Sequence, residues 1–252
     1  MFRLPSSSFL LCFSLILTCC LNATVQAQRS TQLLVVTTSD WNAIHGRLQR
    51  YERENARDRW KAVGQPVNVV VGKSGLGWGI GIRNVPRASG PIKKEGDGKA
   101  PAGIFRLSAT FGYAPAQPSA WKMPYIALTK SVECVDDPRS KFYNRIVDRS
   151  SVSPDWNSSE HMLLGDERYQ WGMVVDHNSA NKARSAIPGA GSCIFLHIWR
   201  DPETTTVGCT AMSQADIETM LAWLDPMRSP ILVQLPEAQY KSLRKSWKLP
   251  NF

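Results

Sequence analysis

Short apolar and β-branched segments separated by glycines recur along this chain, and they restrict it to a fold rich in strands. The first segment, Leu33 to Thr38, reads Leu-Leu-Val-Val-Thr-Thr. Glycines at 72, 75, 90, 96 and 98 separate the segments that follow, where turns are expected. Strands are therefore predicted at 33–38, 67–71, 77–82, 103–107, 169–175, 193–198 and 231–233.

Two stretches have the spacing of an amphipathic helix. Ser213 is a suitable N-cap with Asp216 three residues later, and an apolar stripe follows at Ile217, Met220, Leu221 and Leu224. Near the N-terminus, Ser39 precedes a stripe formed by Trp41, Ile44, Leu48 and Tyr51, with arginines between. We expect helices at both places, in one mostly β domain with two or three helices and no internal repeats.

The segment from 108 to 170 is rich in proline, serine, aromatic and charged residues and has no clear period. A long irregular segment inside a domain often forms a lid or a binding loop. Within it, Glu160 and His161 are expected at the surface or in hydrogen bonds. Residues 236–252 are expected to form a basic C-terminal tail.

The first 27 residues are typical of a signal peptide. Arg3 gives a positive start, Phe9 to Leu21 is apolar, and Val25-Gln26-Ala27 provides small residues before a cut. Such an apolar run is short for a membrane span, which takes about 20 residues, although a retained anchor stays open. We expect an exported protein of the periplasm or cell envelope, with no membrane span in the mature chain.

The formal net charge of +9 fits an anionic envelope polymer, although it is equally explained by solubility alone. Nucleic acid is the weaker interpretation because no recognisable binding motif accompanies the charge. A metal site is not expected, since the chain has no His-Glu-x-x-His and no Cys-x-x-Cys. No cofactor is predicted, and the oligomeric state is left open.

His197 lies in the apolar run Phe195-Leu196-His197-Ile198. Cys209 comes later, directly after the short turn Thr206-Val207-Gly208. A thiol needs a base or a cation beside it to act as a nucleophile near neutral pH, and imidazole is the usual choice. Gly208 allows a tight turn and leaves room for backbone donors to an oxyanion. These residues predict Cys209 as nucleophile and His197 as general base; the alternatives are a buried structural cysteine and a core histidine.

The order of His before Thr-x-Gly-Cys resembles the L,D-transpeptidase (YkuD-type) family of peptidoglycan enzymes, and in particular an exported bacterial subgroup. The motif Ala100-Pro101-Ala102-Gly103-Ile104-Phe105 resembles an upstream element of that family, as do the segments 134–138 and 191–197. The resemblance covers roughly residues 33–235. Val207 and Ala211 depart from the family pattern, which often has His and then Arg or Asn at those places.

The resemblance implies a β-sandwich-like catalytic fold and attack by a Cys209 thiolate on a peptidoglycan stem peptide. D-Alanine would leave, and the thioester would pass to an amine of another stem as a 3–3 cross-link. Hydrolysis by an L,D-carboxypeptidase or amidase is one alternative, and a non-catalytic wall-binding protein on the same fold is another. Candidate substrate-binding residues are Thr206, Trp199, Arg200 and Asn178.

The cysteine count is informative once the signal segment is set aside. Cys134, Cys193 and Cys209 remain, and an odd count in an oxidising compartment leaves one thiol over. If Cys209 is the free nucleophile, then Cys134 and Cys193 are a plausible disulfide. The alternative is that both are buried free thiols that pack as small hydrophobic side chains.

Overall fold

Most of the ordered elements in this protein are strands. The computed structural model describes residues 30–83, 90–180 and 185–251, so the predicted signal peptide at 1–27 lies outside the described residues. The large sheet contains β1 (Gln32–Thr38), β2 (His45–Glu52), β3 (Lys61–Val70), β4 (Leu76–Trp78), β5 (Ala100–Gly112), β6 (Tyr125–Ala127), β10 (Trp171–Val175), β11 (Phe195–Ile198), β12 (Thr210–Met212) and β13 (Ile231–Pro236). The mostly β fold expected from the sequence is confirmed.

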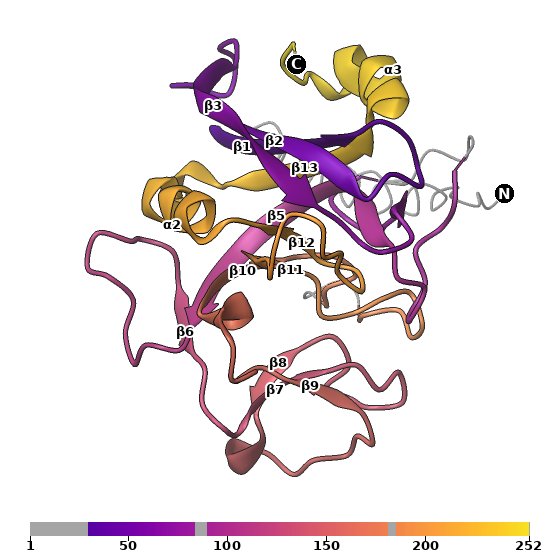
Figure 1. The fold of residues 1–252 in the computed structure, drawn as a ribbon, viewed down its shortest axis with the longest axis vertical. Helices are drawn as coiled ribbons and strands as arrows, with labels where there is room; N and C mark the ends of the chain where they lie inside the picture. The colour runs from indigo at the N-terminus through magenta and orange to yellow at the C-terminus, as the bar shows by residue number, and fades with distance from the viewer. Residues whose placement is uncertain (1–29, 84–89, 181–184, 252) are drawn as a thin grey trace, which may run out of the picture.

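The large sheet curls until its two ends meet. Its strands follow the order β10-β11-β12-β3-β2-β1-β13-β5-β4, and β10 also pairs antiparallel with β5. The two layers of the expected sandwich are thus parts of one curved sheet (Figure 1). Its inward side chains form one apolar core, in which the β1 residues from Leu33 to Val36 are fully buried.

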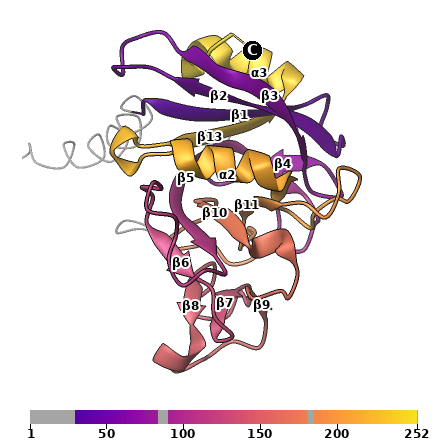
Figure 2. The same ribbon diagram turned by 60° about the vertical axis from the view of Figure 1, so that its left-hand side comes forward.

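Helix α2 (Gln214–Trp223) lies between the strands of this curved sheet, as Figure 2 shows. Ser213 caps it by accepting the amide of Asp216, as the sequence predicted. The stripe of Ile217, Met220 and Leu221 is buried and packs into the same core as the strands. Because α2 follows β12 directly, it anchors the strand that comes immediately after Cys209.

The predicted helix after Ser39 is wrong, because β2 occupies most of it. The Asp40 side chain accepts the amides of Asn42 and Ala43, as at a helix start, but the chain then extends. Strands β1 and β3 pair with β2 along both of its edges. These ladders satisfy the β2 backbone on both sides, and this tertiary pairing outweighs a weak local helical pattern.

The segment predicted to be irregular contains a second, small sheet. Strands β7 (Val132–Val135), β8 (Ile146–Asp148) and β9 (Ser159–His161) pair in the order β8-β7-β9, with short 3-10 turns η1 (Arg149–Ser151) and η2 (Glu167–Tyr169) nearby. Figure 1 shows this sheet at the lower end of the molecule, away from α3. It forms a separate wall beside β10 and β11.

The basic C-terminal segment is largely helical. After the 3-10 turn η3 (Pro226–Arg228) and β13, helix α3 (Glu237–Trp247) contacts β1 and β13. The Tyr240 hydroxyl donates to the Pro250 carbonyl, and the Tyr51 hydroxyl to that of Asn251. These bonds hold the chain end against the sheet. Within the described residues, no helix is both long and apolar enough to cross a membrane.

Candidate active site

Cys209 and His197 line one cleft of about 450 Å³. His197 lies on β11 and pairs in register with Ala211 on the parallel strand β12. Cys209 directly precedes β12, two residues before Ala211. Because side chains alternate along a strand, Cys209 and His197 face the same side of the sheet. The fold therefore brings together the two residues that the sequence predicts for chemistry.

The thiol of Cys209 is buried in this cleft. Only 5% of the residue is exposed. Its Sγ accepts the Phe195 amide at 3.3 Å and lies 3.6 Å from the Cys193 carbonyl, to which it donates. Burial raises the pKa of Cys209 to about 12, and the negative charge of Glu160 acts in the same direction. Cys209 is therefore a neutral thiol near neutral pH.

His197 is buried as a neutral imidazole. Its Nδ1 lies 2.8 Å from the Ile198 carbonyl oxygen, and a carbonyl can only accept, so Nδ1 carries the proton. The lone pair is then on Nε2, which is the correct tautomer for a general base. Burial lowers the pKa of His197 to about 4. The carbonyl takes the orienting role that an aspartate has in other nucleophile–histidine sites.

The turn that presents Cys209 is fixed by Thr206. The Thr206 hydroxyl donates to the Cys209 carbonyl at 2.6 Å and accepts the Gly208 amide at 3.2 Å. Gly208 has φ of +155°, a region that favours glycine. Thr206 thus lines the cleft but chiefly shapes the turn. The Gly208 amide, a predicted oxyanion donor, donates to the Thr206 hydroxyl.

The other predicted substrate-binding residues divide into two groups. Trp199 and Arg200 line the cleft, and the Arg200 guanidinium is exposed, 3.8 Å from Asp166. Asn178 is completely buried, and it does not line this cleft. Its amide donates to the carbonyls of Ile187 and Gly191. Asn178 therefore holds a loop in place, and its prediction as a substrate-binding residue is corrected.

A model of the YkuD L,D-transpeptidase catalytic domain matches residues 43–233. The chain belongs to this family. The family consists typically of acyltransferases that modify peptidoglycan. Searches among curated proteins and among solved structures gave no match. The matched region of this L,D-transpeptidase family member contains both His197 and Cys209 and leaves out β1 and α3.

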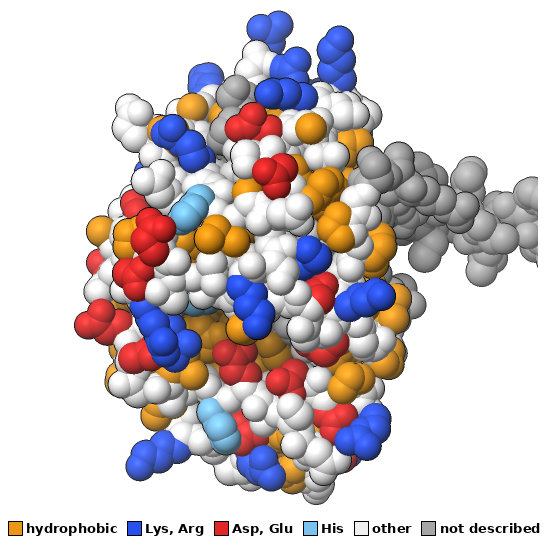
Figure 3. Space-filling model, turned by 45° about the vertical axis from the view of Figure 1, so that its right-hand side comes forward, with side chains coloured by type: hydrophobic (Ala, Val, Ile, Leu, Met, Phe, Trp, Pro, Cys, Tyr) orange, Lys and Arg blue, Asp and Glu red, His pale blue; other side chains and the backbone are white. Residues whose placement is uncertain are grey.

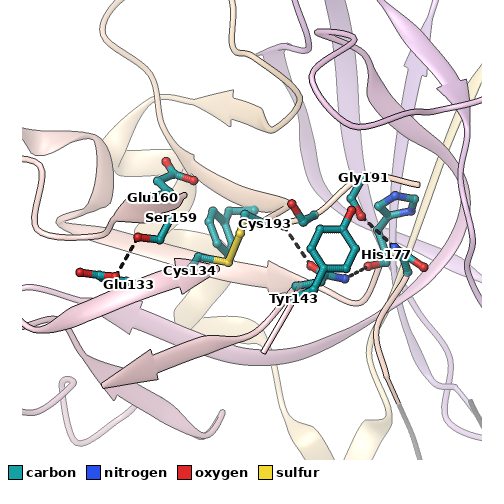
Figure 4. Close-up of a disulfide and its surroundings, with 12 residues drawn as sticks. Glu133, Cys134, Tyr143, Ser159, Glu160, His177, Gly191 and Cys193 are labelled. Atoms are coloured by element: carbon teal, nitrogen blue, oxygen red, sulfur yellow. Dashed lines mark hydrogen bonds between the residues drawn. A yellow bond between two sulfur atoms is a disulfide. The ribbon is translucent and has the colours of Figure 1, made fainter. Parts of the chain in front are cut away.

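A disulfide ties the small sheet to the segment that leads into β11. Cys134 on β7 is bonded to Cys193, with the two Cα atoms 5.9 Å apart, while Cys209 is free. Figure 4 shows this disulfide between Cys134 and Cys193. Beside it, the Asn144 side chain accepts the Cys193 amide and donates to the His177 carbonyl. This is the pairing predicted from the cysteine count. Because the Cys193 carbonyl contacts Cys209, the cross-link lies one step from the nucleophile.

Sequence reasoning did not place Glu160 or Tyr169 in the cleft. Glu160 on β9 lines the cleft together with Tyr169 at the end of η2, whereas neighbouring His161 is exposed, as expected. Both lie at the end of the segment without periodicity, and no pattern there indicates a shared site. The sequence does show Glu160 next to His161, but it does not indicate which of these two side chains faces the cleft.

The described part of the chain contains no set of side chains suited to binding a metal ion. No group of three or more His, Cys, Asp or Glu side chains lies there in a metal-binding arrangement. The histidines His177 and His197 both use ring nitrogens in bonds to the protein backbone.

Proposed function

We propose that this protein is a peptidoglycan L,D-transpeptidase that forms 3–3 cross-links through a thioester at Cys209, with release of D-alanine. We further propose that it is exported and acts in the periplasm or cell envelope. The observation that carries the proposal is that a free, buried thiol lines the same cleft as an imidazole whose Nδ1 is bonded to a carbonyl, which leaves the lone pair on Nε2. The family to which the chain belongs consists typically of acyltransferases that modify peptidoglycan.

The first half-reaction begins from the neutral pair. His197 Nε2 takes the thiol proton while Sγ attacks the carbonyl carbon between the third residue and the terminal D-alanine. The oxyanion forms near the backbone at Gly208 and Cys209, where each donor is typically worth about 3 kcal/mol. When the C–N bond breaks, the imidazolium returns its proton to the leaving amine. The product is a thioester and free D-alanine.

The second half-reaction reverses these roles. A side-chain amine of another stem binds beside the thioester in its neutral form. As the amine nitrogen attacks the thioester carbonyl, His197 accepts the proton that this nitrogen loses. The C–S bond breaks, and the sulfur recovers a proton from the imidazolium. The direct cross-link is formed, and the neutral thiol and imidazole are restored. No external cofactor is needed to balance either step.

The charges around the cleft support a zwitterionic peptide as substrate. Basic lining residues include Lys73 and Arg168 as well as Arg200, and acidic ones include Asp136 and Glu160. Figure 3 shows side chains of both signs close together around a hollow in the face that it presents. A stem peptide carries carboxylates and a side-chain amine, so its charges have counterparts on this surface.

Hydrolysis is the second candidate, and the exposure of Val207 favours it. Val207 stands where the family often has a histidine, and 75% of it is exposed. The small side chain of Ala211 lies opposite His197 in the sheet register. Both leave the nucleophile's surroundings more open to water, which would resolve the thioester to a tripeptide stem. The same fold without turnover would act only as a wall-binding protein.

One assay distinguishes these outcomes. The chain without residues 1–27 is incubated with a disaccharide tetrapeptide, and the products are separated and weighed by mass spectrometry. A cross-linked dimer with one D-alanine lost supports transfer, a tripeptide supports hydrolysis, and unchanged but bound substrate supports a binding protein. Cys209→Ser is the matched control, since a hydroxyl has a far higher pKa than a thiol. Dimer formation by that variant would contradict the proposed thioester.

A further inference from the structure

Glu160 and Tyr169 form a close pair inside the cleft. Tyr169 is buried, with 3% of its surface exposed. Its hydroxyl donates to Glu160 Oε1 at 2.5 Å, and a donor–carboxylate bond of this length is among the stronger kinds. Glu160 lies on β9 of the small sheet, and Tyr169 lies on η2, just before β10. This bond therefore joins the small sheet to the segment that leads into β10.

The ring of Tyr169 packs against the imidazole of His197. The two ring centroids are 5.2 Å apart in an edge-to-face arrangement. Tyr169 also meets the rings of Phe111 and Phe195 edge to face, at 5.4 and 5.6 Å. Such contacts limit how far each ring can turn. The imidazole is therefore held by the Ile198 carbonyl at Nδ1 and by an aromatic cluster at its side.

The same pair acts electrostatically on Cys209. Tyr169 and Cys209 belong to one buried cluster that borders the cleft. Burial raises the pKa of Cys209 and the Glu160 charge raises it further, whereas the Tyr169 hydroxyl acts in the opposite direction and favours the thiolate. Burial raises the pKa of Glu160 itself. The other groups that face this cluster are Asp136 after β7, Arg168 on η2, Lys93 before β5 and His197 on β11.

We propose that Tyr169 and Glu160 are positioning residues that control when Cys209 becomes reactive. The tyrosine hydroxyl has one proton to donate. When Glu160 is ionised it takes that hydrogen bond, and its charge adds to the effect of burial in disfavouring the Cys209 thiolate. When Glu160 is protonated or its charge is balanced by a cation of the substrate, the hydroxyl is free to turn to the sulfur and stabilise the thiolate. This inference rests on the proposed function only in taking Cys209 as the nucleophile.

The experiment measures the rate at which iodoacetamide alkylates Cys209 as a function of pH. Intact-protein mass spectrometry follows the reaction, and peptide mapping locates the adduct. Two variants are made, Glu160→Gln, which keeps hydrogen-bonding groups without the charge, and Tyr169→Phe, which keeps the ring without the hydroxyl. The controls are Glu95→Gln and Tyr143→Phe, since Glu95 and Tyr143 form a second 2.5 Å pair, whose further partner is Ser192.

The two variants are expected to change the profile in opposite directions. Glu160→Gln should move the midpoint of the alkylation profile to lower pH. At a pH below the midpoints of both the wild type and the variant, each pH unit of this shift makes alkylation about tenfold faster. Tyr169→Phe should move it to higher pH and slow alkylation several-fold. Both controls should stay within about twofold of the wild type. Thermal unfolding by circular dichroism checks that each variant is folded.

A purely structural role predicts a different result. If Glu160→Gln and Tyr169→Phe alter the alkylation rate in the same direction, or match the controls, the inference is overturned. Should Glu160→Gln fail to fold, an unchanged midpoint in Tyr169→Phe overturns it by itself. Opposite shifts in alkylation support the inference even where stem peptides are not turned over, and that absence of turnover would count against the proposed function alone.

Discussion

Removing the disulfide tests whether the small sheet is a support for the active site. The double variant Cys134→Ala/Cys193→Ala opens a loop with a sequence separation of 59 residues. Loop-closure entropy for that length gives a loss of about 4 kcal/mol in the free energy of unfolding, inside the usual range of roughly 2–5. Because the Cys193 carbonyl lies 3.6 Å from Cys209 Sγ, turnover should fall as well.

Urea unfolding of the oxidised proteins measures the stability difference by linear extrapolation. Cys209→Ala is the matched control, since it removes a buried sulfur from the same apolar cluster without opening a cross-link, and it should cost about 1 kcal/mol. The reasoning is refuted if the double variant loses no more stability than twice that control. An unchanged rate of product formation would show that the small sheet does not support the nucleophile.

Three further predictions concern the cleft and the chain end. First, the acid limb of kcat/KM should lie near pH 4, because burial lowers the pKa of His197 and the base is lost only when the imidazole is protonated; a limb at pH 6–7 would contradict this. Second, Gly208→Ala should cost roughly 1–3 kcal/mol from its φ of +155° and reduce turnover; unchanged activity and melting temperature would argue against a strained turn. Third, deleting residues 237–252 should lower the melting temperature by several degrees, because α3 covers β1 and β13; an unaltered melt would mean that α3 is dispensable.

Sequence reasoning succeeded where local chemistry and local structure agree. The Ser213 cap and the stripe beginning at Ile217 both indicated α2, and the β-branched run at Leu33 indicated β1. The turn before Cys209 was recognisable because glycine and threonine have specific roles there. In each case a few neighbouring residues carried all the information needed.

It failed where distant strands decide the conformation. The segment after Ser39 has helical spacing, yet β1 and β3 impose a strand on it. Glu160 and Tyr169 come together through the small sheet, whose short strands have no repeating pattern. Asn178 was predicted to bind substrate, but its side-chain amide donates to the backbone carbonyls of Ile187 and Gly191. These outcomes depend on long-range pairing, which a single sequence does not reveal.

The position of β13 between β1 and β5 has a consequence for how the chain folds. Leu33 pairs in parallel with Ile231, and Phe105 pairs with Leu232. The strand that joins the N-terminal hairpin to β5 is therefore the last strand in the described part of the chain. Until the ribosome has released it, β1 and β5 each lack a neighbour, and contacts this distant in sequence form slowly. The N-terminal hairpin can therefore join β5 in one sheet only after the chain has been made as far as Pro236.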